Sequence, residues 1–131
     1  MATASRLSQI ATEPALGVHP ANEYLFFIVI GPVGAYYSEG FSPTKIYVTE
    51  DYVRSVRGSI GYCKAAANYA ASLYASKLAM EQGYTQVLWL DAIERKNVEE
   101  VGTSNIFFLI GDELITPPLS GSILPGVTRN S

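Results

Sequence analysis

A lysine in a run of small residues is the first position in this chain that could do chemistry. Lys64 follows Cys63 and precedes three alanines, and it stands just before a segment with helical character. An amine that is desolvated among small apolar neighbours has a lowered pKa and becomes a nucleophile. The alternative is a surface lysine whose stem lies along the protein, and for an isolated lysine this alternative is the commoner case.

A pair of glutamates ends the strand expected at residues 98–100. Side chains alternate along a strand, so one of Glu99 and Glu100 must face inward if that face of the sheet is covered. A buried carboxylate needs a cationic partner, and a protonated ring nitrogen would serve. The alternative is a carboxylate in a solvated turn, which is favoured when Glu100 is considered alone.

Residues 124–128 form a loop with Pro125 and Gly126 that leads into a helix. The backbone N–H groups at a helix start bind phosphate without a charged side chain, and Arg129 stands close by. An ordinary Pro-Gly turn is the alternative. His19 is the single histidine, which leaves no His-based triad and no metal cluster, and Cys63 is better explained as a small buried residue.

The elements that must position these residues are mostly strands. Apolar runs predict strands at residues 24–30, buried on both faces, and at 45–48, 86–90, 98–100, 106–110 and 114–116. One long helix follows Lys64, with Asn68 as a plausible cap and Gly83 as its stop. Its predicted apolar stripe contains Tyr69, Leu73, Ser76 and Met80, flanked by Tyr74 and Leu78. This pattern indicates an α+β or mixed α/β fold.

Composition excludes several classes of protein. The chain has 131 residues, 48% of them hydrophobic and 16% charged, which is typical of a globular domain. Its net charge is −3 with scattered charges, so nucleic-acid binding is not indicated. No apolar run spans a bilayer, and the single cysteine fits a reducing compartment. We therefore expect a cytoplasmic protein, or an organellar one in a eukaryote, that does not enter membranes.

Six blocks, in order, resemble branched-chain amino acid aminotransferases, which are fold-type IV pyridoxal-phosphate enzymes. The similarity runs from about Ile10 to Ser131. The blocks are residues 12–18, residues 32–37, Lys64 with Asn68 and Tyr69, residues 86–91, residues 100–103 with Asn105, and residues 116–119 with residues 123–129.

The resemblance implies a set of roles. Lys64 matches the lysine to which pyridoxal phosphate is covalently attached, and Tyr69 matches the tyrosine that hydrogen-bonds the cofactor's phenolic oxygen. Glu100 matches the carboxylate that pairs with the ring nitrogen. The remaining positions either hold the phosphate through backbone N–H groups or line the pocket: Val127 and Thr128 for the phosphate, Thr103 and Asn105 for the pocket.

The implied reaction transfers the amino group of leucine, isoleucine or valine to 2-oxoglutarate, in a homodimer. A D-amino acid aminotransferase or an aminodeoxychorismate lyase shares the fold and is the alternative enzyme. A truncated product without catalysis is a third possibility. The chain departs from the family at Ala66 and Ala67, where glycines are usual, and at Tyr62 and Ser104.

The resemblance also predicts a chain incomplete at both ends. Residues 1–22 are expected to be an irregular arm or interdomain segment, and residues 23–131 part of the cofactor-binding large domain. The family's smaller domain, which supplies an arginine to the phosphate, has no counterpart here. Open sheet edges and an uncovered apolar face should result, and the isolated chain should turn over very slowly or not at all.

Overall fold

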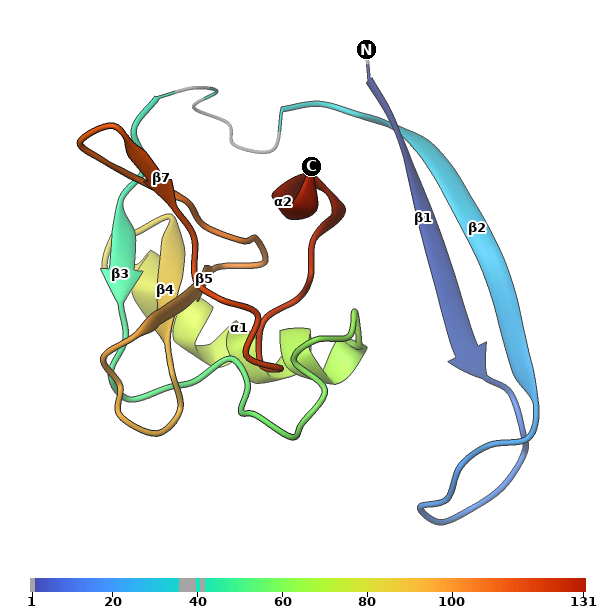
Figure 1. The fold of residues 1–131 in the computed structure, drawn as a ribbon. Coiled ribbons are helices and arrows are strands. Elements are labelled where there is room, and N and C mark those ends of the chain that lie inside the picture. Colours follow the sequence, from blue (N-terminus) through green and yellow to red (C-terminus); the bar gives the residue numbers. More distant parts are fainter. Residues whose placement is uncertain (1, 36–39, 41) are drawn as a thin grey trace. The chain divides into compact units, whose positions relative to one another are not determined.

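A computed structural model describes the chain except for residues 1, 36–39 and 41 (Figure 1). The chain divides into two compact units, Met1–Ser42 and Pro43–Ser131. Residues 23–42 therefore group with the N-terminal segment and not with the larger unit. Tyr36 and Tyr37, which end the second matching block, lie outside the described residues.

The smaller unit contains a long antiparallel hairpin. Strand β1 (Ala2–Ala11) pairs with strand β2 (Tyr24–Val33) from Ala2 opposite Val33 to Ala11 opposite Tyr24. The expectation that residues 1–22 are irregular is thus wrong for β1. A ladder of backbone hydrogen bonds with β2 stabilises this segment, and such a ladder needs no hydrophobic pattern in β1.

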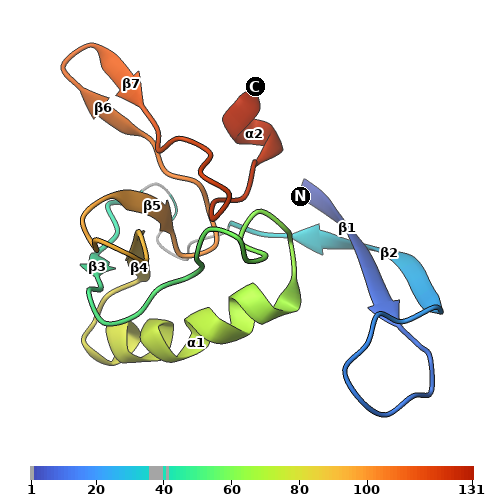
Figure 2. The same ribbon diagram turned by 60° about the horizontal axis from the view of Figure 1, so that its bottom comes forward.

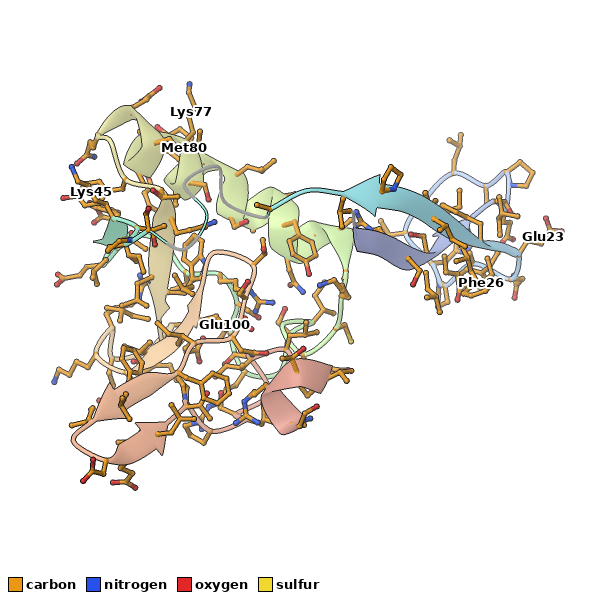
Figure 3. All side chains as sticks on the ribbon, turned by 90° about the horizontal axis from the view of Figure 1, so that it is seen from above. Glu23, Phe26, Lys45, Lys77, Met80 and Glu100 are labelled. Atoms are coloured by element: carbon orange, nitrogen blue, oxygen red, sulfur yellow. The ribbon has the colours of Figure 1, made fainter. Side chains whose placement is uncertain are left out.

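Strand β2 forms where the apolar run predicts a strand, but it is not buried on both faces. Phe26 is 57% exposed and Ile30 is 69% exposed. Figure 3 shows Phe26 on this hairpin. A two-stranded ribbon covers neither of its own faces, so the apolar side chains of β2 contact solvent. The expected uncovered apolar surface is present in this unit.

The larger unit is built on a three-stranded sheet in the order β3-β4-β5. Strand β3 (Ile46–Val48) runs parallel to β4 (Gln86–Leu90), and β4 runs antiparallel to β5 (Val98–Val101). Parallel neighbours need a crossover connection. Helix α1 (Ala66–Glu81) supplies it and lies against β4 (Figure 2).

The core lies between α1 and β4. It consists of Ala75, Ala79, Val87 and Trp89, each at most 3% exposed, and tyrosines 47, 52 and 84 pack against it. The predicted apolar stripe of the helix is wrong. Small residues allow the helix to approach the sheet closely, whereas the larger side chains project into solvent. The buried helix positions are Asn68, Ser72, Ala75 and Ala79, and the exposed ones include Leu73, Tyr74 and Met80.

The ends of α1 follow the expected chemistry only at the C-terminus. Gly83 has φ of 82°, and its N–H donates to Met80 O at 2.9 Å, so it ends the helix as predicted. The N-cap is Ala65 and not Asn68. Asn68 lies in the first turn of the helix, where its side chain donates to carbonyls of the preceding loop.

A short hairpin and a short helix complete the unit. Strands β6 (Phe108–Ile110) and β7 (Glu113–Ile115) form the predicted hairpin, with Gly111 at φ of 61° in the turn. Helix α2 (Val127–Asn130) begins where the Pro-Gly loop predicts a helix. The mixed α/β fold class is therefore confirmed. Within the described residues, no helix combines the length and the apolar character needed to cross a bilayer.

Candidate functional site

Glu100 lies at the centre of a buried polar cluster. It stands opposite Trp89 in the sheet and is 2% exposed. Its Oε1 accepts a hydrogen bond from Asn105 Nδ2 at 3.1 Å, and its Oε2 lies 2.8 Å from Arg54 Nη1. The label in Figure 3 marks this residue. The predicted inward-facing carboxylate with a cationic partner is therefore present.

Burial dominates the electrostatics of this carboxyl. Desolvation raises the pKa of Glu100 from 4.5 to about 7. The Arg54 guanidinium, the Leu124 backbone N–H and the Lys64 charge each lower that pKa, whereas Glu99 raises it. The Glu100 carboxyl therefore titrates near neutral pH. The fraction that is ionised at that pH depends on the positive charges around it.

One oxygen of Glu100 lacks a well-directed donor. Arg54 Nη1 is close enough to Oε2 for an ion pair, but its N–H groups point toward the carbonyls of Gly61 and Ser122. Within the described part of the chain, Oε2 accordingly accepts no hydrogen bond of good geometry. A buried carboxylate oxygen in this state can accept a hydrogen bond from a donor group of a ligand.

Arg54 is the functional candidate that the sequence analysis missed. Its side chain is 5% exposed, and it donates to Ser122 O at 2.9 Å and to Gly61 O at 3.3 and 3.4 Å. The sequence indicated only that a buried Glu100 needs a cationic partner, and any arginine in the chain could have met that need. Nothing in the sequence singled out Arg54 for that role.

The side chain of Asn68 holds the loop that carries Lys64. Asn68 Nδ2 donates to Ile60 O at 2.8 Å and to Cys63 O at 2.9 Å. Lys64 Nζ lies 5.7 Å from the centroid of the Tyr69 ring, within the range of a cation–π contact. The expectation that Lys64 is desolvated is wrong for this chain, since its side chain is exposed.

Lys64 and Glu100 nevertheless share one electrostatic environment. The positive charge of Lys64 is near enough to lower the pKa of Glu100. Arg54 adds a structural link, because it contacts both Glu100 and the carbonyl of Gly61, at the start of the lysine loop. The two residues are therefore not on opposite surfaces of the unit.

Asn105 joins Glu100 to the start of α2. Its Nδ2 also donates to Leu124 O at 2.9 Å, and its Oδ1 packs where a Cβ on Gly126 would lie. Val127 and Thr128 follow directly and are exposed. The first N–H groups of a helix have no partner within it, so this end of α2 presents donors. Thr103 is exposed in the turn after β5.

Both glutamates of the pair are buried, contrary to the expectation of one. Glu99 is 8% exposed and accepts a hydrogen bond from Ser122 Oγ, which in turn contacts Ser120 Oγ at 2.8 Å. Strand β5 is thus covered on both faces. A cavity of about 290 Å³ lies on the Glu99 side, and neither Lys64 nor Glu100 lines it.

The departures at Ala66 and Ala67 cause no backbone strain. Both residues lie in the first turn of α1, and Arg95 is the non-glycine residue with a positive φ among those described. Helical alanine is favourable, so the glycine-specific conformation is not needed here. Tyr62 and Ser104 are exposed, at the lysine loop and in the turn after β5 respectively.

Sequence and structure comparisons place these observations in one family. Residues 16–131 match the pattern of the family described as amino-transferase class IV, and the chain belongs to this family. It is 60% identical over 123 residues to branched-chain-amino-acid transaminase 1 of Bacillus subtilis, with 93% of this chain covered. The chain spans about a third of the length of the curated relatives it matches, and 35% of that one.

Solved structures agree with the fold assignment. The branched-chain amino acid aminotransferase of Escherichia coli matches with a TM-score of 0.76 and 28% identity, over 96% of this chain and 42% of that one. The holo-form of the Thermobaculum terrenum enzyme, described as the PLP-form, matches with a TM-score of 0.73 and 28% identity, over 96% and 39%. The fold is therefore that of fold-type IV aminotransferases.

Proposed function

We propose that this chain is the lysine-bearing part of a pyridoxal-phosphate-dependent branched-chain aminotransferase. The reaction moves the amino group of leucine, isoleucine or valine to 2-oxoglutarate. The observation that carries the proposal is the buried Oε2 of Glu100, which has an unused acceptor position within the electrostatic reach of Lys64. The names of the relatives supply the substrate class.

The residues present fit pyridoxal phosphate. Glu100 offers a carboxylate oxygen for the ring N–H, and Lys64 offers a primary amine on a fixed loop. Tyr69 offers a hydroxyl for the phenolic oxygen, and the N–H groups of Val127 and Thr128 suit a phosphate. When bound, pyridoxal phosphate supplies an aldehyde that captures the substrate amine and a ring that withdraws electrons from it.

The chain's own residues divide the remaining tasks. The Nζ of Lys64, as a free amine, would take the proton from the α-carbon of the substrate and deliver it to the cofactor carbon that had carried the aldehyde. The carboxylate of Glu100 accepts the ring N–H and keeps that proton in place. Asn105 holds the same carboxylate through Nδ2, and Thr103 lies in the turn between them.

The wider assignments follow from the same proposal. Residues 1–22 belong to an arm or interdomain segment, and residues 43–131 carry the cofactor-binding domain, because residues 23–42 group with the N-terminal hairpin. Branched-chain L-amino acids and 2-oxo acids are the partners, and the assembly is a homodimer in the cytoplasm. The exposed apolar side chains of β2, such as Phe26 and Ile30, provide surface that such an assembly would cover.

The test is covalent trapping of the cofactor. The protein that carries this chain, at its full length, is mixed with pyridoxal phosphate, reduced with borohydride and mapped by peptide mass spectrometry. Label on Lys64 is the expected result, and a Lys64→Arg variant is the matched control that should remain unlabelled. Label on Lys45, Lys77 or Lys96 instead, or on no lysine, would overturn the assignment. Lys45 and Lys77 are marked in Figure 3.

Substrate class needs a separate measurement. Turnover with L-leucine, L-isoleucine or L-valine and 2-oxoglutarate supports the branched-chain assignment. Turnover of D-alanine without turnover of L-leucine would show a D-amino acid aminotransferase, and release of pyruvate from aminodeoxychorismate would show the lyase. If the protein exists as these 131 residues alone, we expect very slow or no turnover.

A further inference from the structure

The buried ion pair between Arg54 and Glu100 carries a desolvation cost that its contacts within the fold do not fully offset. Both side chains are at most 5% exposed, and removing two charges from water is unfavourable unless geometry and hydrogen bonds compensate for it. The guanidinium is satisfied by two backbone carbonyls, but Oε2 of the carboxylate is not satisfied by the described residues. The pair is thus built with one unused acceptor.

We propose that Arg54 is the positioning residue of this site, whose guanidinium keeps the carboxylate of Glu100 ionised and aligned to accept the ring N–H of the cofactor. This inference rests on the proposed function for the identity of the ring. Arg54 does not touch the reacting atoms in this role, because it acts through Glu100. The contact between Arg54 and Glu100 does not depend on the identity of that ring.

The charges around Glu100 identify Arg54 as the main source of stabilisation. Arg54, Lys64 and Glu99 are the charged side chains that act on the Glu100 carboxyl, and the Leu124 N–H adds a hydrogen bond. Glu99 opposes ionisation. Lys64 acts more weakly than Arg54, and its side chain is exposed. A fixed, buried cation is therefore the group suited to hold Glu100 in its ionised state.

The anchoring of Arg54 explains why an arginine suits this position. Its two terminal nitrogens reach the carbonyls of Gly61 and Ser122 while Nη1 remains 2.8 Å from Oε2. A guanidinium has five donors in a rigid plane and stays charged at any pH the protein meets. Lysine could restore the charge but not this geometry.

The first test measures Glu100 without any cofactor. Proteins with ¹³C-labelled glutamate carboxyls are titrated by NMR as wild type, Arg54→Gln and Arg54→Lys, at the full length of the protein, and Glu100→Gln assigns the signal. Losing the charge should increase the proton affinity of Glu100 by roughly tenfold or more. Arg54→Lys should restore a large part of the wild-type pKa. Equal titration of all three proteins would overturn the proposal.

The second test separates positioning from general structural support. Dissociation constants are measured for pyridoxal phosphate and for its deaza analogue, in which C–H replaces the ring nitrogen. Arg54→Gln should weaken binding of pyridoxal phosphate by roughly tenfold to a hundredfold, the range for a hydrogen bond to a charged group. It should weaken binding of the analogue much less. Equal losses for both compounds would show a structural role only and overturn the proposal.

The two failures can be told apart. If borohydride labels no lysine in the wild type, the proposed function fails, but the cofactor-free titration still judges the effect of Arg54 on Glu100. If Lys64 is labelled and Glu100 titrates alike in every variant, the positioning role fails alone. Circular dichroism monitors folding, and should Arg54→Gln not fold, the charge-retaining Arg54→Lys is compared with wild type for selective loss of pyridoxal phosphate over its analogue.

Discussion

Ionisation of Glu100 should make this chain less stable as the pH rises toward neutrality. In the unfolded chain the carboxyl titrates near 4.5, and in the folded chain near 7. Between these values the folded chain holds a proton that the unfolded chain has released, so unfolding becomes easier as the pH rises. The stability that protonated Glu100 contributes is fully present below pH 4.5 and is lost as the pH passes through about 7.

The size of this effect follows from the two pKa values. Each tenfold change in proton affinity corresponds to about 1.4 kcal/mol, so the rise from 4.5 to about 7 amounts to about 3 kcal/mol. Glutamine at position 100 does not titrate. The free energy of unfolding of the Glu100→Gln variant should therefore rise by about 3 kcal/mol relative to that of wild type between about pH 4 and about pH 8. This relative change does not depend on how stable the variant is at either pH.

The assay is urea unfolding at a series of pH values, followed by the fluorescence of Trp89. This is the chain's single tryptophan, and it lies fully buried opposite Glu100, so its signal reports on the larger unit. Glu113→Gln removes an exposed carboxylate and controls for the loss of one negative charge. Parallel curves for wild type and Glu100→Gln across this pH window would refute the reasoning.

Three further predictions concern other residues of the larger unit. Gly126→Ala places a Cβ against Asn105 Oδ1 and should destabilise the chain by about 1–3 kcal/mol in urea unfolding; additive effects with Asn105→Ala would argue against this contact. Backbone N–H groups lower the pKa of Asp91, so Asp91→Asn should reduce the melting temperature above pH 3.8, with the difference disappearing as the pH falls well below that value. Trp89 is fully buried and donates to Gly102 O, so its emission should be blue-shifted and resist acrylamide; ready quenching would contradict that burial.

Several local features of the fold are readable from the sequence. The run at residues 86–90 predicts β4, Gly111 predicts the β6–β7 turn, and Gly83 predicts the end of α1. These features depend on interactions within a few residues, such as the freedom of glycine to adopt positive φ. The cofactor class and the matching residues were readable as well, but through resemblance to a family and not through the strength of any single motif.

Burial was decided by tertiary structure. The apolar run of β2 is exposed because its hairpin partner β1 covers neither of its faces. The small residues of α1 are buried because the helix lies closely against β4. Glu99 and Glu100 are both buried, because Arg54 and Asn105 contact Glu100 whereas Ser122 contacts Glu99. A periodic pattern records which residues share a face, but it does not record what packs against that face.

The sequence by itself determined the order of the elements from β2 to α2, though not β1, together with the turns and the amine and carboxylate with which this chain could act. Only the tertiary structure decided that Arg54 meets Glu100, that Asn105 connects Glu100 to α2, and that the charge of Lys64 reaches the same carboxyl. The physical reason is that an ion pair depends on distance in space and on exclusion of water. Both quantities arise only when segments far apart along the chain pack together.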